Sequence, residues 1–322
     1  MGLRAMVGRA LQVVLALIAV TAPPDVGRGP AASCGSVDIA VLRNLPAGPF
    51  EANRMDLWLP SERDATLHGA LLVVHGGGWD DPLQRQGGVS PVSARLACEL
   101  RVPVLSVDYR LVREGGTHPG NVRDLRCALR WVGRHAVTLG LGAPRVVAVG
   151  ESAGGQLALL AAAGQHEELF APLEACGAAS TETALAGVVS VSAPLELPSM
   201  LERPLPGRGG EEAARAVRGV VGGSCAQGVE LTQCLEASPM QHAAALPPVL
   251  LVFSEGDHLV PASQAHTLAE AMTRNGRSVT LLEVPLAARA HCQDRRSLHG
   301  FSPCLLDPVS ERTVAWLRRQ LR

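Results

Sequence analysis

The sequence RVVAVGESAGGQLA, residues 145–158, decides the fold. Its first five residues, Arg145 to Val149, form an apolar run with the length and composition of a buried strand, and a helical pattern runs from Ala153 to Ala163. Ser152 lies between the two, with small residues on both sides. A sharp turn from strand to helix needs small neighbours because larger side chains would collide there. The segment predicts that the Ser152 hydroxyl is a nucleophile exposed at the carboxyl edge of a sheet.

A second glycine-rich segment, HGGGW at residues 75–79, directly follows another apolar run, Ala70 to Val74. Acyl transfer places negative charge on the former carbonyl oxygen of the substrate, and glycine N–H groups can approach that oxygen closely. The N–H groups of Gly77, Gly78 and Ala153 are therefore the candidate oxyanion hole.

The other residues of this segment have different expected roles. His75 stands at the strand end and is expected to be structural, whereas Trp79 is expected to shape the substrate pocket. A phosphate-binding loop would require a Lys and a Ser or Thr that the segment lacks. The chain contains no lysine, so all 29 basic residues are Arg, which excludes Schiff-base and lysine-base mechanisms.

Composition limits the possible classes of function. Of the 322 residues, 47% are hydrophobic and 18% are charged, which excludes a disordered or collagen-like chain. The formal net charge of -1 creates no long-range field for a phosphate backbone or an anionic membrane surface. We therefore expect a small-molecule partner and no nucleic acid, with the oligomeric state left open.

Apolar runs and helical patterns alternate after residue 66, which is typical of a mostly parallel sheet with helices on both faces. The expected strands are Ala70 to Val74, Val102 to Val107, Arg145 to Val149, Gly187 to Val191, Val249 to Phe253 and Val279 to Val284. The expected helices are Pro91 to Leu100, Asn121 to Thr138, Ala153 to Ala163, Ser263 to Arg274 and Pro308 to Leu321.

Two segments depart from this alternation. Val37 to Leu42 and Arg54 to Leu59 are expected to form an antiparallel edge of the sheet. Between about residues 198 and 239 the alternation stops, and Pro and Gly are frequent around a short helical pattern from Glu211 to Val221. This segment is predicted to be a small cap inserted over the sheet.

These motifs together resemble the α/β-hydrolase family, in particular carboxylesterases with an HGGG oxyanion loop. That branch includes hormone-sensitive-lipase-like esterases, acetyl xylan and feruloyl esterases, and kynurenine formamidases. The resemblance extends from about Met55 to the C-terminus. It rests on the following residues: HGGGW at 75–79, VDYRL at 107–111, DLRCALRWV at 124–132, GESAGGQLA at 150–158, PPVLLV at 247–252 and EGD at 255–257. The resemblance implies the α/β-hydrolase fold and serine-hydrolase chemistry.

A serine nucleophile needs a histidine base and an acid that orients it, and both follow the serine in this fold. The resemblance places the acid at Asp257, with Glu255 as the alternative. Two histidines compete for the base. His291 lies six residues after Pro285, whereas His299 lies fourteen residues after it but precedes Gly300-Phe301, as the family base often does. We take His291 as the preferred base, because the loop to it is shorter, and His299 as the alternative.

The N-terminus predicts export. Arg4 and Arg9 precede an apolar stretch from Ala10 to Ala22, which is too short to span a bilayer comfortably and ends at two prolines. Residues 1–33 are expected to be a signal peptide and processing region, and residues 34–322 a single hydrolase domain that is periplasmic or secreted. No integral membrane span is expected, and lipid anchoring at Cys34 is the less favoured alternative.

The chain has eight cysteines, an even number that suits disulfides in an exported protein. Cys225 with Cys234, and Cys292 with Cys304, would close short loops. Cys98 and Cys127 fall on helical patterns and are expected to be small buried hydrophobes instead.

The sequence thus predicts an exported serine esterase that hydrolyses small-molecule carboxylic esters with short acyl groups, such as acetyl, through an acyl-enzyme. No metal and no organic cofactor is expected. The alternatives are an aryl formamidase that uses the same residues and a hydrolase-fold binding protein that lacks catalysis.

Overall fold

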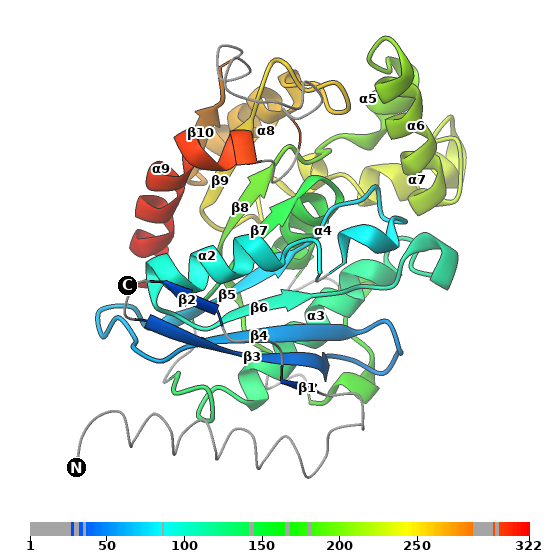
Figure 1. Ribbon diagram of the computed structural model, residues 1–322. Coiled ribbons are helices and arrows are strands. Elements are labelled where there is room, and N and C mark those ends of the chain that lie inside the picture. The colour runs from blue at the N-terminus through cyan, green and yellow to red at the C-terminus, as the bar shows by residue number, and fades with distance from the viewer. Residues whose placement is uncertain are drawn as a thin grey trace, which may run out of the picture.

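The computed structural model describes residues 27–28, 32–34, 37–85, 87–141, 145–164, 168–178, 182–285, 299 and 303–322. Within these residues one sheet dominates the structure (Figure 1). Its strands are β1 (Gly27–Arg28), β2 (Ala32–Cys34), β3 (Val37–Pro46), β4 (Arg54–Pro60), β5 (Gly69–Val74), β6 (Val104–Val107), β7 (Arg145–Glu151), β8 (Leu185–Val191), β9 (Val249–Phe253) and β10 (Val279–Glu283). They are arranged in the order β1-β3-β4-β6-β5-β7-β8-β9-β10, and β2 pairs with β3.

The pairing of neighbouring strands changes once across the sheet, from antiparallel to parallel. β3, β4 and β6 pair in antiparallel fashion, whereas the pairs from β6 and β5 onward to β10 are all parallel. The predicted antiparallel edge and the predicted parallel strands are therefore confirmed. All carboxyl ends of the parallel strands meet at one edge of the sheet, which is where the loops that carry chemistry are expected in an open parallel sheet.

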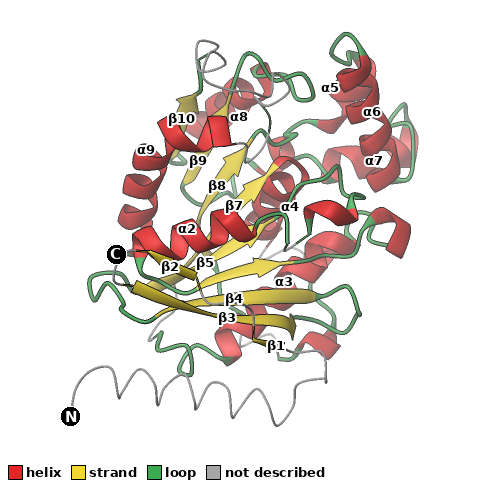
Figure 2. Cartoon of the chain, in the orientation of Figure 1, coloured by secondary structure: helices red, strands yellow, loops and turns green. Residues whose placement is uncertain are grey.

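Helices cover both faces of the sheet, as predicted (Figure 2). They are α2 (Ser90–Leu100), α3 (Gly120–Arg134), α4 (Ser152–Ala163), α8 (Ser263–Arg274) and α9 (Pro303–Leu321). Apolar side chains of α2 and α9 join one buried cluster, whereas those of α3, α4 and α8 join the other. α9 begins five residues before the predicted start at Pro308.

The helix that follows Ser152 has an unusual composition. Ala153 to Ala163 are all buried, because α4 packs between the sheet and α3. A helix enclosed on all sides is apolar all round rather than amphipathic. The N-terminus of α4, and with it Ser152, is therefore held in a fixed place by the core.

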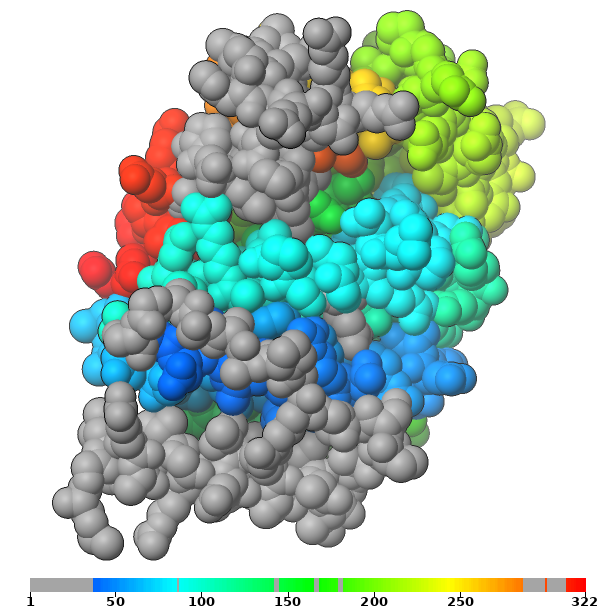
Figure 3. Space-filling model, viewed as in Figure 1, coloured from blue at the N-terminus to red at the C-terminus, as the bar shows by residue number. Residues whose placement is uncertain are grey.

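The predicted cap is present, but it contains three helices where one was expected. They are α5 (Leu197–Glu202), α6 (Arg208–Val221) and α7 (Gly228–Glu236), and they lie together at one end of the molecule, green in Figure 3. Within α7 only Cys234 is buried. α5 and α7 have six and nine residues, which is shorter than the window over which a helical period can be recognised, and this is why the sequence did not predict them.

The disulfides agree with the prediction in part. Cys225 and Cys234 are bonded across the turn between α6 and α7, as expected. Cys127 is bonded to Cys176, and Cys98 is also disulfide-bonded, so the expectation of two free buried thiols is wrong. Helical periodicity shows that a cysteine faces the core, but it does not show what lies opposite. The predicted Cys292 to Cys304 pair lies outside the residues whose side chains are described.

Across the described part of the chain, every helix is too short or too polar to cross a bilayer.

Candidate active site

The carboxyl ends of four parallel strands bring the predicted residues together. The HGGGW loop follows β5, Ser152 follows β7, Asp257 lies four residues after the end of β9, and His299 lies in the connection between β10 and α9. β5 and β7 are neighbours in the sheet, and β8 separates β7 from β9.

The turn at the nucleophile is closely packed, which explains its small residues. Ser152 has a φ of 47°, a left-handed conformation that L-residues adopt at a cost. A Cβ atom on Gly150 would lie 2.5 Å from the carbonyl oxygen of Gly154, and one on Gly154 would lie 2.3 Å from the carbonyl oxygen of His75. Only glycine fits at either position, so the predicted sharp turn from strand to helix is present.

Ser152, His299 and Asp257 form a hydrogen-bonded chain. The Nε2 atom of His299 lies 2.8 Å from Oγ of Ser152, and its Nδ1 atom lies 2.8 Å from Oδ2 of Asp257. The other carboxylate oxygen of Asp257 accepts the N–H groups of Leu259 and Val260 at 2.8 and 3.0 Å. The carboxylate is thus fixed by its own turn, and it in turn orients the imidazole.

The geometry favours the alternative base over the preferred one. His291 lies outside the described residues, and both ring nitrogens of His299 already make the two contacts that a base in this position must make. Loop length was a poor criterion, because a residue of extended chain spans up to about 3.5 Å and a longer loop can fold back to the same point. Gly300-Phe301 was the better signal. Glu255 is exposed and Asp257 is buried, so the predicted choice of acid agrees with the structure.

One contact that supports this arrangement was not predicted. Oγ of Ser254, the residue after β9, donates a hydrogen bond to the carbonyl oxygen of Val284 at 2.8 Å and accepts the N–H of Gly256 at 3.2 Å. It thereby ties the turn that carries Asp257 to the end of β10. A serine in a turn gives no signal of such a partner in the sequence.

The oxyanion loop has the conformation that its glycines permit. Gly77 and Gly78 have φ values of 90° and 56°. None of the hydrogen bonds among the described residues engages the N–H groups of Gly77, Gly78 or Ala153. A Cβ atom on Gly78 would lie 3.3 Å from Cβ of Ala216, so α6 of the cap covers this loop closely.

Trp79 is among the residues that line the cleft at Ser152, as expected, but little of its side chain is exposed there. Its side chain is only 2% exposed, and its indole Nε1 donates to Oε1 of Gln156 in α4 at 3.0 Å. Nε2 of Gln156 donates to the carbonyl oxygen of Ala237, next to α7, at 2.7 Å. Trp79 therefore offers little surface to a substrate, and it anchors the oxyanion loop to α4 and to the cap.

His75 is structural, as predicted. Its ring is fully buried and stacks on Tyr109 with the ring centroids 4.3 Å apart, and Nδ1 lies 2.9 Å from the carbonyl oxygen of Gly76. The Tyr109 hydroxyl donates to the carbonyl oxygens of His75 and Gly76. Burial lowers the pKa of His75 to about 4, so the ring stays neutral at physiological pH and holds the start of the loop.

A cleft of ≈ 800 Å³ opens in front of Ser152 and His299. Its floor is the oxyanion loop, and residues of α6 form the opposite wall. The wall and rim carry several charged groups: Asp80, Asp81, Arg113, Glu151, Glu212 and Arg215. Asp80 and Arg113 form a pair at 3.0 Å. The described residues include no group of three His, Cys, Asp or Glu side chains placed to hold a metal ion.

Comparisons with known proteins agree with this geometry. The family model BD-FAE matches residues 55–272. The carboxylesterase NlhH of Mycobacterium tuberculosis H37Rv is 37% identical over 108 residues, which are 33% of this chain and 31% of that protein. The probable carboxylic ester hydrolase LipM of the same organism is 28% identical over 245 residues, 74% of this chain and 53% of LipM. The matches thus span about a third to a half of the length of these curated relatives.

Two solved structures share the fold over nearly the whole chain. A bacterial heroin esterase superposes with a TM-score of 0.67 at 21% identity, covering 99% of this chain and 93% of that one. Esterase B from Lactobacillus Rhamnosis (HN001) superposes with a TM-score of 0.68 at 21% identity, covering 98% of this chain and 97% of that one. At these identities the likeness shows the α/β-hydrolase fold, and the fold predicted from the sequence is therefore confirmed.

Proposed function

Because the chain belongs to the BD-FAE family of α/β-hydrolase carboxylesterases, we propose that it is an exported serine esterase that hydrolyses carboxylic esters of short acyl groups. The observation that carries the proposal is the hydrogen-bonded chain from Ser152 through His299 to Asp257. This hydrogen-bonded chain lies in an open cleft beside N–H groups of the oxyanion loop that no hydrogen bond within the described part of the structure engages.

In the acylation step, Oγ of Ser152 attacks the ester carbonyl carbon while Nε2 of His299 takes the hydroxyl proton. Asp257 keeps the other ring proton on Nδ1, so that Nε2 is free to accept, and it stabilises the imidazolium that forms. The negative charge on the former carbonyl oxygen is received by the N–H groups of Gly77, Gly78 and Ala153. The carbon–oxygen bond to the alcohol then breaks, and His299 gives its proton to the leaving alcohol.

In the deacylation step, the same groups act on water. His299 takes a proton from a water molecule whose oxygen attacks the acyl-enzyme carbonyl, and the oxyanion loop again receives the charge. The bond to Ser152 breaks, Oγ recovers the proton from His299, and the carboxylic acid leaves. The cycle uses only these protein groups and one water.

The cleft supports a substrate with a polar alcohol part. Arg215 and Glu212 on α6 are exposed and line the cleft together with Asp81, which lies beside the oxyanion loop. The apolar part of the lining, which includes Pro194, Met200 and Leu259, suits a short acyl group, whereas a hydroxylated alcohol can form hydrogen bonds with the charged groups. We therefore propose short acyl groups, such as acetyl, on a polar alcohol.

The test is hydrolysis of p-nitrophenyl acetate, butyrate and decanoate by the protein without residues 1–33, with disulfides formed. We expect acetate and butyrate to be cleaved with a higher kcat/KM than decanoate. The Ser152→Ala and His299→Ala variants should each lose at least about 10³-fold in kcat. His291→Ala is the matched control and should keep the activity of the wild type. Loss of activity in His291→Ala alone would assign the base to His291 instead.

Two further measurements separate the alternatives. A fluorophosphonate probe reacts with an activated serine, so a binding protein without catalysis would not be labelled at Ser152. An N-formyl aryl amide assayed beside the esters tests the formamidase alternative, which a strong preference for the amide would support.

Export is part of the proposal, and the disulfides support it. Cys127–Cys176 and Cys225–Cys234 are bonds that form and persist in oxidising compartments. N-terminal sequencing of the protein recovered outside the cytoplasm should begin after Ala22, within the proposed processing region. A protein that retains residues 1–22 in the cytoplasmic fraction would contradict export.

A further inference from the structure

Two serines near the carboxyl end of the strand between the nucleophile and the acid take no part in the proposed mechanism. β8 lies between β7, which carries Ser152, and β9, which leads to Asp257. Ser190 is on β8 and Ser192 is the residue after it, and both are buried, at 2% and 3% exposure. Neither hydroxyl has a hydrogen-bond partner among the described residues. Buried hydroxyl groups without partners are rare because their desolvation is not compensated.

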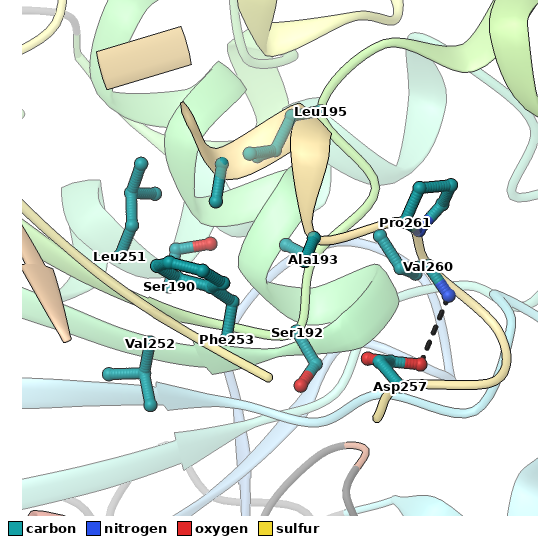
Figure 4. Close-up of a pocket in the computed structure, with 12 residues that line it drawn as sticks. Ser190, Ser192, Ala193, Leu195, Leu251, Val252, Phe253, Asp257, Val260 and Pro261 are labelled. Carbon is teal, nitrogen blue, oxygen red and sulfur yellow. Dashed lines mark hydrogen bonds between the residues drawn. The ribbon is translucent and has the colours of Figure 1, made fainter. Parts of the chain in front are cut away.

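Both hydroxyls belong to a small cavity that Asp257 also lines. The cavity has a volume of ≈ 10 Å³, and its other walls are apolar residues of β9 and of the segments that follow β8 and precede α8 (Figure 4). Ala265 of α8 also lines it. A single buried water needs about 10–15 Å³ and two to four polar partners. The cavity therefore has the size and the polar groups for one water.

The backbone at Ser192 is also unusual. Ser192 has a φ of 50°, and its N–H donates to the carbonyl oxygen of Val252 at 2.8 Å, which fixes it beside β9. A left-handed conformation is costly for a serine, and such residues cluster at functional sites. Glycine would adopt the same backbone without this cost, but it would leave no hydroxyl beside Asp257.

The carboxylate of Asp257 has room for one more donor. Oδ1 already accepts two N–H groups, whereas among the described residues Oδ2 accepts only Nδ1–H of His299. A carboxylate oxygen can accept two hydrogen bonds. The remaining acceptor position on Oδ2 and the two serine hydroxyls are thus polar groups of residues that line the same cavity, which has room for one water molecule.

We propose that Ser192 is a positioning residue for the proposed esterase reaction and that it acts through one buried water. The hydroxyls of Ser192 and Ser190 hold the water, and the water donates a hydrogen bond to Asp257. The inference rests on the proposed function, since its effect on the rate is exerted through Asp257 and His299. Gly155 makes the site possible, because a Cβ atom there would lie 2.9 Å from Oγ of Ser190.

The water would affect both geometry and protonation. It limits the rotation of the carboxylate, and small misplacement of a catalytic group is costly. Its O–H dipole also points its positive end at Asp257, so it weakens the attraction between the carboxylate and the imidazolium that forms on His299. Another titratable ring, His258, lies with its centroid 6.4 Å from that of His299.

The test compares four proteins in p-nitrophenyl acetate hydrolysis from pH 5 to 9. Ser192→Ala removes the hydroxyl, and Ala265→Val fills the cavity but leaves every polar group in place. Ala269→Val adds the same methyl groups to α8 outside this cavity and is the matched control. Thermal unfolding of each variant shows that it is folded.

For Ser192→Ala and Ala265→Val we expect kcat to fall about tenfold with KM unchanged. The acid limb of kcat/KM should move up by about half a pH unit in both variants, but not in Ala269→Val. Wild-type profiles in both variants would overturn the proposal. A change in Ser192→Ala alone would overturn the role of the water.

A high-resolution crystal structure of the wild type tests the site independently of activity. A water within hydrogen-bonding distance of Ser192 Oγ and Asp257 supports the proposal, and an empty cavity overturns it. If the wild type holds this water but cleaves no ester, the proposed function fails and the rate effect inferred from it fails too, while the water site stands.

Discussion

Gly154 touches the carbonyl oxygen of His75, so that the first turn of α4 and the start of the oxyanion loop are in direct backbone contact. A Cβ atom on Gly154 would lie 2.3 Å from that oxygen and 2.5 Å from the carbonyl oxygen of Val74. Both neighbours are backbone atoms, so the contact cannot be relieved by turning a side chain. The nucleophile and the oxyanion hole are therefore placed relative to each other by a glycine.

The Gly154→Ala variant should push the two segments apart. We expect kcat for p-nitrophenyl acetate to fall by about 10² or more, because misplacement by about 1 Å is enough for such a loss. Gly87→Ala is the matched control, since a Cβ atom there would meet nothing within 4 Å. Equal activity in the two variants would show that the loop can move without affecting catalysis.

Much of the fold could be predicted because local patterns determine it. β9 (Val249–Phe253) and α8 (Ser263–Arg274) have the predicted bounds. β9 is a continuous apolar run, and the apolar residues of α8 repeat with the helical period, so both patterns are local in the sequence. α7 was missed because its nine residues are too few to establish a helical period, and the bond between Cys127 and Cys176 was missed because it joins segments that are 49 residues apart.

The residues of the site can also be divided into those that local sequence predicts and those that it does not. Ser152 and the glycines of the oxyanion loop could be predicted because their chemistry requires particular neighbours in the sequence. The choice of His299, the burial of Trp79 and the contacts of Ser254 depend on how distant segments meet in space. Spacing along the chain carries no information about these contacts.

Two buried histidines should make the protein less stable in acid. Burial is the main cause that lowers the pKa of His118 and of His75 to about 4, from 6.5 in the unfolded chain. The unfolded state then binds more protons between pH 6.5 and 4, so stability is complete above pH 6.5 and falls as the pH falls through this window. At pH 5 each histidine should lower the free energy of unfolding by about 2 kcal/mol.

The His118→Phe variant tests this expectation. Both ring nitrogens of His118 are buried without a hydrogen-bond partner among the described residues, and the ring packs against Phe170. Urea unfolding should show that, from pH 7.5 to pH 5, the free energy of unfolding falls by about 2 kcal/mol less in the variant than in the wild type. Substitution of the exposed His68 by Gln should leave the difference between the two pH values unchanged. An unaltered difference in His118→Phe would contradict the expected titration.

Glu182 neutralises two buried arginines. Its carboxylate accepts Nε–H of Arg126 at 2.6 Å and of Arg130 at 3.3 Å, and the two arginine side chains are only 5% and 8% exposed. The Glu182→Ala variant would leave both guanidinium groups buried without this partner. We expect the free energy of unfolding to fall by about 3 kcal/mol or more, measured by urea unfolding with disulfides intact.

The control for this variant is an exposed pair of the same charge type. Glu270 and Arg274 are 71% and 68% exposed and lie 3.7 Å apart. Glu270→Ala should change stability by less than about 0.5 kcal/mol. If Glu182→Ala were equally mild, the arginines would have found other partners in the carbonyl groups around them.

The Trp79→Phe variant tests whether the hydrogen bond of Trp79 positions the oxyanion loop for catalysis or only stabilises the fold. It removes the indole N–H that binds Oε1 of Gln156, so the loop loses its anchor on α4. The loop donors act on charge that develops in the transition state, so kcat should fall about tenfold while KM stays the same. Trp58 is the matched control, because its buried indole N–H donates to Oγ of Ser106 in β6. Trp58→Phe should lower the thermal midpoint but keep kcat, and an equal kcat in the two variants would show that Trp79 contributes only to packing.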